Sequence, residues 1–244
     1  MANEAIPRRR FLAGAGAAGT AVAAALTGEL AAPGASEAAA RHKAARASHG
    51  PAHAEPLLTL TATEAAFVSA AVDTFIPADD LSPSGSDCGV AVFIDRQLAG
   101  AWGSGARLYR DGPYLQGKPE HGYQLALTPR EFFRAGIAAT NEWTVKTHGK
   151  EFDRLPPADR EAALKELEQG KVAFDGFSSK QFFEALLGIT MEGFFSDPIY
   201  GGNRDKAAWK MIGYPGLPAT YADDMKTYFG KRYDKPPQSI ADFS

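Results

Sequence analysis

The chain has 244 residues and a formal charge of −3, from 26 Lys and Arg against 29 Asp and Glu, and it contains one cysteine. A charge this close to neutral disfavours a nucleic-acid binder, which typically carries a basic excess. One cysteine excludes an internal disulfide, a four-cysteine zinc site, a self-contained cysteine-ligated iron–sulfur cluster and a C-x-x-C-H haem attachment. We therefore expect no redox centre of its own in this chain.

The composition divides the chain into two unlike pieces. Residues 1–56 contain 21 alanines and a single aromatic residue, Phe11, whereas the other 25 of the 26 aromatic residues lie in 57–244. Aromatic side chains bury the most apolar area per residue, so only the second piece can build a packed core. We predict one folded domain over residues 57–244, which is long enough for a single core.

The first piece begins with the pattern of an export signal. Its basic motif includes Arg8, Arg9, Phe11 and Leu12 and precedes an Ala/Gly-rich apolar run from Ala13 to Leu26. A run of about 14 residues is too short to span a bilayer but is typical of a signal peptide. The motif resembles the twin-arginine signal, whose pathway carries folded proteins, although a proline stands where Ser or Thr is usual. We predict a cleavable twin-arginine-type signal peptide over residues 1–31; a disordered basic tail is the alternative.

Residues 32–56 are predicted to form a flexible Ala/His-rich linker. The tract contains His42, His49 and His53, and histidines in a flexible segment can bind a metal loosely. No rigid element holds these spacings, so a solvated linker is the better interpretation and no metal site is predicted.

The first two helices of the folded part follow from local signals. A capping box from Thr61 to Glu64 opens an apolar helix that Pro77 stops. A loop over 78–89 then leads into a second helix from Val90 to Leu98. The residues expected to face inward are Phe67, Val68, Ala71, Val72, Phe75, Ile76, Val90, Phe93, Ile94 and Leu98.

The rest of the chain continues the helical pattern. The stretch 100–127 is irregular and rich in Gly and aromatic residues, and its length indicates a functional or partner-facing segment. Further helices are predicted to begin at the capping boxes of Thr128 and Ser178, after Pro156, and near Lys206. No period-two strand pattern is found. We predict an all-α fold, an irregular multi-helix bundle of about five to seven helices with long loops.

The folded part offers little for catalysis. A nucleophile–base arrangement needs a base, and the only histidines there are His121, in a loop, and His148, at a helix end where it complements the helix dipole. The pairs 79–80 and 223–224 are aspartates adjacent in the chain, which do not face each other as a general acid and base would. We predict no catalytic, cofactor-binding or metal-binding residue, and interpret Asp79 and Asp80 as loop-capping groups or surface charges.

A Gly-rich element follows the most apolar helix, from Tyr200 to Arg204. It lacks the spacing of a phosphate-binding loop, and we interpret it as a helix-terminating turn in which glycine accepts positive φ. The aromatic residues Tyr200, Trp209 and Tyr214 are of the kind that anchors interfaces. Core packing explains them equally well.

The single cysteine, Cys88, follows Asp87 at the start of the second helix. That position is expected to lower a thiol pKa. In an exported protein an odd cysteine indicates either a disulfide to another chain or a buried thiol, so Cys88 is a candidate inter-subunit disulfide.

Several blocks of the chain together resemble the gluconate 2-dehydrogenase subunit 3 family, the small or gamma subunits of bacterial membrane-bound gluconate, fructose and glucose dehydrogenases. The resemblance covers roughly residues 57–220. It rests on FIPADD at 75–80, SPSG at 82–85, GVAVFIDRQL at 89–98, EGFFSDPIYGGN at 192–203 and WKMIGYPG at 209–216.

The resemblance implies a non-catalytic subunit that carries no cofactor. In such complexes a flavoprotein subunit holds FAD and oxidises the sugar or sugar acid, and a multihaem cytochrome c subunit passes electrons to quinone. The flavoprotein is expected to cross the membrane folded, through the twin-arginine translocase, on the small subunit's leader. The complex is then periplasmic and attached to the inner membrane. The candidate partner-interface residues are Ile76, Pro77, Asp79, Asp80, Tyr200, Asn203, Trp209 and Tyr214.

Two alternatives of other classes remain. One is an independent periplasmic enzyme that uses His121 with a nearby carboxylate. The other is a sugar-binding protein, which the Trp and Tyr residues of the stretch 100–127 favour. The subunit hypothesis differs from both because it predicts low solubility for the isolated chain, whose apolar face is exposed without the partner.

Overall fold

A computed structural model describes residues 55–115, 117–118, 124–217 and 221–243. The chain divides into two units, 1–54 and 55–244, and only the second is described below. The predicted export residues Arg8, Arg9, Phe11 and Leu12 and the candidate base His121 lie outside the described residues.

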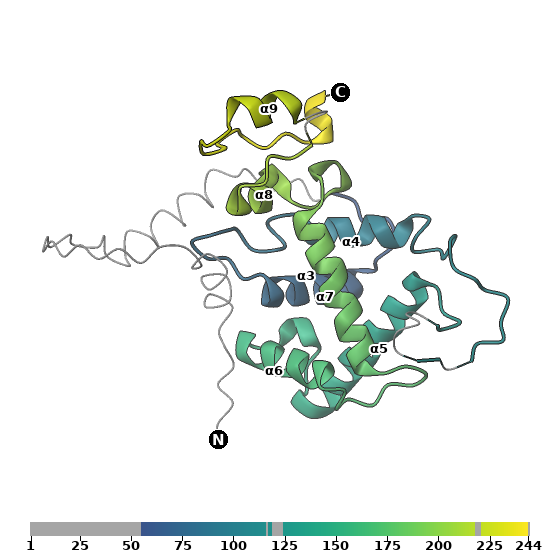
Figure 1. Cartoon of the computed structure of the whole chain (residues 1–244). Helices are drawn as coiled ribbons and strands as arrows, with labels where there is room; N and C mark the ends of the chain where they lie inside the picture. The colour runs from purple at the N-terminus through teal and green to yellow at the C-terminus, as the bar shows by residue number, and fades with distance from the viewer. Residues whose placement is uncertain (1–54, 116, 119–123, 218–220, 244) are drawn as a thin grey trace, which may run out of the picture. The chain divides into compact units, whose positions relative to one another are not determined.

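The described residues contain seven α-helices and no strand. Figure 1 shows how the helices are arranged. Irregular segments and short 3₁₀ turns join the helices, which confirms the all-α prediction and its expected number of helices. The helices are α3 Ala62–Phe75, α4 Val90–Ala99, α5 Pro129–His148, α6 Pro157–Glu168, α7 Ser179–Phe195, α8 Ala207–Ile212 and α9 Ala222–Thr227. The 3₁₀ turns are η2 Phe152–Arg154, η3 Pro198–Tyr200, η4 Arg204–Lys206 and η5 Ile240–Phe243.

Three of the helices begin where capping boxes were predicted. At the start of α3 the Thr61 hydroxyl accepts the Glu64 N–H, and the Glu64 carboxylate accepts the Thr61 N–H. The same reciprocal bonds occur at the starts of α5 and α7. Each box satisfies backbone donors that a helix otherwise leaves unpaired, so these starts are set by residues three apart in the chain.

The core is built around α7, which contacts α3, α4, α5, α6 and α8 (Figure 1). The Phe182 side chain of α7 is fully buried, and its ring centroid lies 6.1 Å from those of Phe132 and Phe133 of α5 and 6.2 Å from that of Phe67 of α3. The Phe67 ring in turn lies 4.8 Å from Phe152 in η2. Aromatic side chains from four elements thus meet in one cluster, consistent with the aromatic-rich composition of this unit.

Candidate partner interface

The turn that follows α7 is tied to the C-terminal end of the described chain by a buried carboxylate. One oxygen of Asp197 accepts the Ile199 N–H at 3.0 Å, and the other accepts the Ile240 N–H at 2.8 Å. Asp197 is 7% exposed, whereas Ile199 and Ile240 are 48% and 36% exposed. A single side chain therefore brings two exposed isoleucines, 41 positions apart in sequence, to the same edge of the molecule.

Asn203 closes this turn from inside the protein. Its side chain is fully buried, its Nδ2 donates to the Ser196 carbonyl at 2.9 Å, and its Oδ1 accepts the Ala208 N–H at 2.9 Å. Both ends of the amide are thus used to join the end of α7 to the start of α8. Asn203 has φ 46°, in the left-handed region that Asn tolerates better than most residues.

The glycines of the same turn are required by its geometry. Gly201 has φ 100°, as expected for a residue that ends a helical turn. A Cβ on Gly202 would lie 2.1 Å from the Gly193 carbonyl oxygen of α7, so only glycine allows the turn to approach the helix this closely. The Gly-rich element is therefore a structural turn, as predicted.

Trp209 belongs to the core, which the sequence had left as one of two interpretations. Its side chain is 4% exposed, and its Nε1 donates to the Phe195 carbonyl at 2.9 Å. The Tyr214 ring packs edge-on against it, with centroids 5.2 Å apart. Tyr214 itself is 37% exposed and Tyr200 50%, so these two tyrosines supply aromatic surface next to a rigid, buried tryptophan.

The second predicted interface segment, the loop after α3, also contains both buried and exposed residues. Ile76 is 5% exposed and belongs to the core, whereas Pro77 and Asp80 are exposed. The Asp79 carboxylate accepts the Leu81 and Ser82 N–H groups at 2.8 and 3.1 Å, which makes it the loop-capping group that was predicted. Of the eight candidate residues, Ile76, Asn203 and Trp209 hold the two segments in place from inside.

The two segments are connected through the turn before α4. The Gly85 N–H donates to the Ile76 carbonyl at 2.9 Å, and the Arg204 N–H donates to the Cys88 carbonyl at 2.9 Å. The Arg204 guanidinium also donates to the Asp87 carbonyl at 3.2 Å. Residues 85–89 therefore bridge the loop after α3 and the turn after α7.

Cys88 lies inside this bridge and does not have the reactive environment predicted for it. Its thiol is 1% exposed and donates to the Pro83 carbonyl at 3.8 Å. Burial, followed by the negative charge of Asp87, raises the pKa of the thiol to about 12. The expectation of a lowered pKa at the helix start was wrong because loss of water outweighs the helix dipole here. The inter-subunit disulfide stays a prediction, and it requires residues 83–89 to open.

We expect Cys88 to react with iodoacetamide at pH 8 at least about a hundredfold more slowly in the native chain than in guanidinium. With a pKa of about 12, the thiolate fraction at that pH is roughly one in ten thousand, against about one in ten for an unperturbed thiol. Mass spectrometry of timed aliquots measures the rate. Equal rates in the two conditions would contradict the buried position, and a reducible band in non-reducing electrophoresis of the purified complex would establish the bridge.

The start of the folded unit is anchored by residues that sequence reasoning did not select. Asp95 of α4 is 2% exposed, and its carboxylate accepts the N–H groups of Leu58, Thr59 and Leu60 at 2.6–3.0 Å. Just before them, Glu55 forms an ion pair with Arg96. A carboxylate on the apolar face of α4, between Phe93 and Leu98, is a sequence signal that would have pointed to this anchor. It ties the first described residues of this unit to α4.

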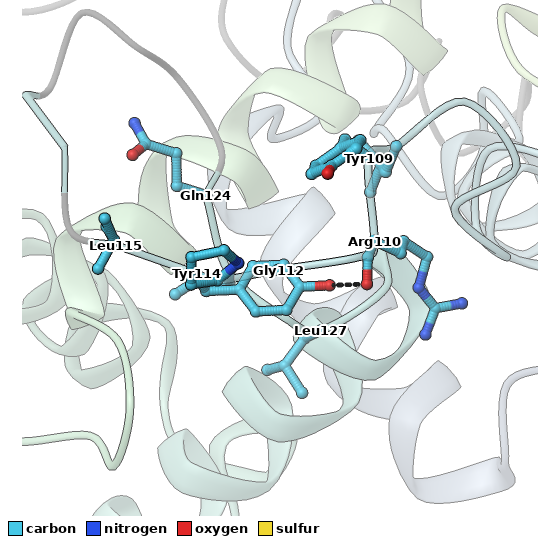
Figure 2. Close-up of a pocket in the computed structure, with 10 residues that line it drawn as sticks. Tyr109, Arg110, Gly112, Tyr114, Leu115, Gln124 and Leu127 are labelled. Carbon is cyan, nitrogen blue, oxygen red and sulfur yellow. Dashed lines mark hydrogen bonds between the residues drawn. The ribbon is translucent and has the colours of Figure 1, made fainter.

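The aromatic stretch before α5 forms a pocket of about 260 Å³. This is slightly below the roughly 300–1,000 Å³ typical of sites for small ligands. Tyr109, Arg110, Tyr114 and Gln124 are among its lining residues, and Figure 2 shows the Tyr114 hydroxyl directed at the Arg110 carbonyl, 2.6 Å away. Sugar binding here stays an alternative prediction.

His148 stands at the C-terminal end of α5, as predicted. It is exposed, and its ring lies edge-on to Trp143 with centroids 6.1 Å apart.

Within the described ranges, no group of three His, Cys, Asp or Glu side chains is placed to hold a metal ion. None of the helices described there is long and apolar enough to cross a membrane.

Exposed apolar side chains gather in the part of the chain after α7. Seven of them form a set that we call the apolar belt, built from η3, the end of α8, the segment after it and η5. Its members are Ile199, Tyr200, Ile212, Tyr214, Leu217, Ile240 and Phe243. Exposed apolar side chains that lie together typically mark a protein–protein contact, and the Asp197 carboxylate brings the Ile199 and Ile240 segments together.

The chain was compared with known proteins. The searches of curated proteins and of solved structures found no match. The family model described as gluconate 2-dehydrogenase subunit 3 matches residues 62–216. This range begins at the first residue of α3 and ends after α8, so it includes the core, the Asp197–Asn203 turn and Trp209. Because the match spans more than half of the chain, the protein belongs to the gluconate 2-dehydrogenase subunit 3 family.

Proposed function

We propose that this chain is the non-catalytic small subunit of a periplasmic, membrane-associated flavoprotein dehydrogenase of the gluconate, fructose or glucose type. In this proposal it stabilises the FAD-bearing catalytic subunit and escorts it through twin-arginine export. The complex is attached to the inner membrane, and a multihaem cytochrome c subunit is the third subunit that such dehydrogenases can contain. The observation that carries the proposal is the family match over residues 62–216.

The surface after α7 supports a role in assembly. Asp197, Asn203 and Trp209 are buried and hold the turn in one conformation, while Tyr200 and Tyr214 beside them are exposed. Aromatic side chains held rigidly lose little conformational entropy on binding, which favours their use as interface anchors. The rest of the apolar belt provides further apolar area for a partner.

The leader provides the link to export. A flavoprotein that folds around FAD in the cytoplasm needs a pathway that accepts folded cargo, and the twin-arginine-like motif at Arg8 and Arg9 is of that kind. A partner without its own signal can then cross the membrane only while bound to this chain. Tight binding before export is therefore part of the proposal.

We expect the double substitution Arg8→Lys and Arg9→Lys to retain both proteins in the cytoplasm. The chain is co-expressed with the flavoprotein encoded beside it, and both are followed by immunoblot in periplasmic and cytoplasmic fractions. Arg10→Lys is the matched control, since it changes the neighbouring arginine outside the motif pair. If the flavoprotein still reaches the periplasm with the double variant, the escort role is refuted.

A further inference from the structure

The chain continues beyond the family match into a lobe that we call the C-terminal lobe, residues 221–238. It contains α9, which contributes no buried residue. Tyr221, Met225 and Phe229 follow one another at intervals of four residues and are 42%, 67% and 88% exposed. Tyr221 directly precedes α9 and donates its hydroxyl to the Gly216 carbonyl at 3.3 Å, and Phe229 lies just after the helix ends. Met225 and Phe229 line the same surface pocket, so the two side chains lie together and form, with Tyr221 at its edge, what we call the apolar face. Phe229 is the most exposed large apolar side chain among the described residues.

The opposite side of the lobe is occupied by its own polar contacts. The Asp224 carboxylate accepts the Tyr233 hydroxyl at 2.7 Å and pairs with the Lys235 ammonium. The Tyr228 ring lies 4.8 Å from that of Tyr233, and the Lys235 ammonium lies 5.8 Å from the Tyr228 centroid. Tyr228 caps the end of α9, and its N–H donates to the Asp224 carbonyl at 2.8 Å. Contacts within the lobe therefore hold its conformation, and its apolar face is exposed.

The C-terminal end of the lobe is hydrogen-bonded to the segment that follows α8. The Leu217 N–H donates to the Gln238 carbonyl at 2.9 Å, and the Gln238 N–H donates to the Pro215 carbonyl at 3.0 Å. Next to this bridge, the Asp242 carboxylate accepts the Ser239 N–H at 2.6 Å and the Lys206 ammonium at 2.5 Å. Figure 1 shows α9 beside the C-terminal turn, beyond α8. The lobe thus adjoins the segments that carry the apolar belt.

The exposed apolar area matches one side of a protein interface. With roughly 200 Å² for a fully exposed large side chain, Tyr221, Met225 and Phe229 leave roughly 400 Å² uncovered and the apolar belt leaves roughly 650 Å². A stable interface buries about 800 Å² per partner, so the lobe alone is too small and the two together suffice. The exposed charges of the lobe outside the Asp224–Lys235 pair are of both signs, Lys226, Lys231 and Arg232 against Asp223 and Asp234. A mixed polar rim suits a protein partner, whereas an anionic membrane surface favours a cluster of basic residues.

We propose that the C-terminal lobe docks this chain onto the FAD-bearing catalytic subunit, with Met225 and Phe229 as the anchors that enter an apolar groove of that subunit. The inference rests on the proposed function and adds to it a surface outside the family match. The pre-shaped lobe lowers the entropic cost of docking, because Asp224, Tyr233 and Lys235 already hold α9 in place.

The test is co-purification of the flavoprotein on the tagged full-length chain after co-expression. The double variant Met225→Ser/Phe229→Ser is expected to retain at least about tenfold less flavoprotein than the wild type, since two central apolar anchors are lost. The matched control is Val145→Ser, which removes a side chain that is 46% exposed on α5, and it is expected to retain as much as the wild type. Circular dichroism and thermal melting of the variants check that each one folds.

Any other result contradicts either the docking surface or the proposed function. Equal retention by the wild type and the double variant overturns the docking surface and leaves the proposed function intact, whereas no retention by the wild type refutes the proposed function itself. Light scattering that shows a wild-type dimer and a monomeric double variant assigns the face to a second copy and overturns the proposal. Flotation of the wild type, but not the double variant, with vesicles of phosphatidylcholine and phosphatidylglycerol overturns it in favour of lipid.

Discussion

Phe182→Ala is expected to lower the free energy of unfolding by about 3–5 kcal/mol, the largest effect that we predict for a single substitution. The side chain is fully buried and its ring packs within 6.2 Å, between centroids, of Phe67, Phe132, Phe133 and Phe174. These rings come from separate parts of the chain and cannot all close the space that alanine leaves. Urea unfolding followed by circular dichroism measures the change.

Val145→Ala is the control for this experiment, because it shortens an exposed side chain on α5 and is expected to change stability by less than about 0.5 kcal/mol. Phe182→Leu should recover part of the loss, since leucine refills some of the cavity. A loss below about 1 kcal/mol for Phe182→Ala would contradict the central position that we assign to this ring.

Asn203→Ala is expected to destabilise the protein by about 2–4 kcal/mol. It removes the buried amide and leaves its two partners, the Ser196 carbonyl and the Ala208 N–H, without their hydrogen bonds, at about 1–3 kcal/mol each. Alanine also tolerates the left-handed φ of 46° less well than asparagine does. Because the amide joins the end of α7 to α8, Trp209 fluorescence should change along with the urea midpoint.

Asn203→Gly separates the two causes of this loss, since glycine accepts the left-handed backbone but makes neither side-chain hydrogen bond. We expect the Asn203→Gly variant to be more stable than the Asn203→Ala variant but less stable than the wild type. If Asn203→Ala leaves both the urea midpoint and the Trp209 spectrum unchanged, the turn does not depend on this amide. The proposed interface would then lack the rigidity that we attribute to it.

Local features were predictable because the groups that determine them are close in the chain. The capping boxes at Thr61, Thr128 and Ser178 involve residues three positions apart, so the helix starts follow from short segments. The apolar spacing within α3, α4 and α7 likewise indicates which face turns inward. The family blocks were recognisable for a related reason: the 192–203 block contains the Gly201, Gly202 and Asn203 that the turn requires.

The state of individual site residues depends on distant parts of the chain. Cys88 lies two residues before α4, and its pKa is raised because surrounding segments exclude water from it. Asp95 has a role only because Leu58, Thr59 and Leu60 lie against α4. A sequence pattern does not contain these contacts, since burial is set by elements that come together from far apart.

The sequence by itself determined the helical class, the starts of α3, α5 and α7, the family and the division between an alanine-rich N-terminal segment and an aromatic-rich domain. Only the tertiary structure decided which members of the matched segments face solvent. It placed Ile76, Asn203 and Trp209 inside and left Tyr200 and Tyr214 outside. The physical reason is that periodicity and capping are local, whereas a side chain's exposure is fixed when α7, α8 and the C-terminal segments pack together.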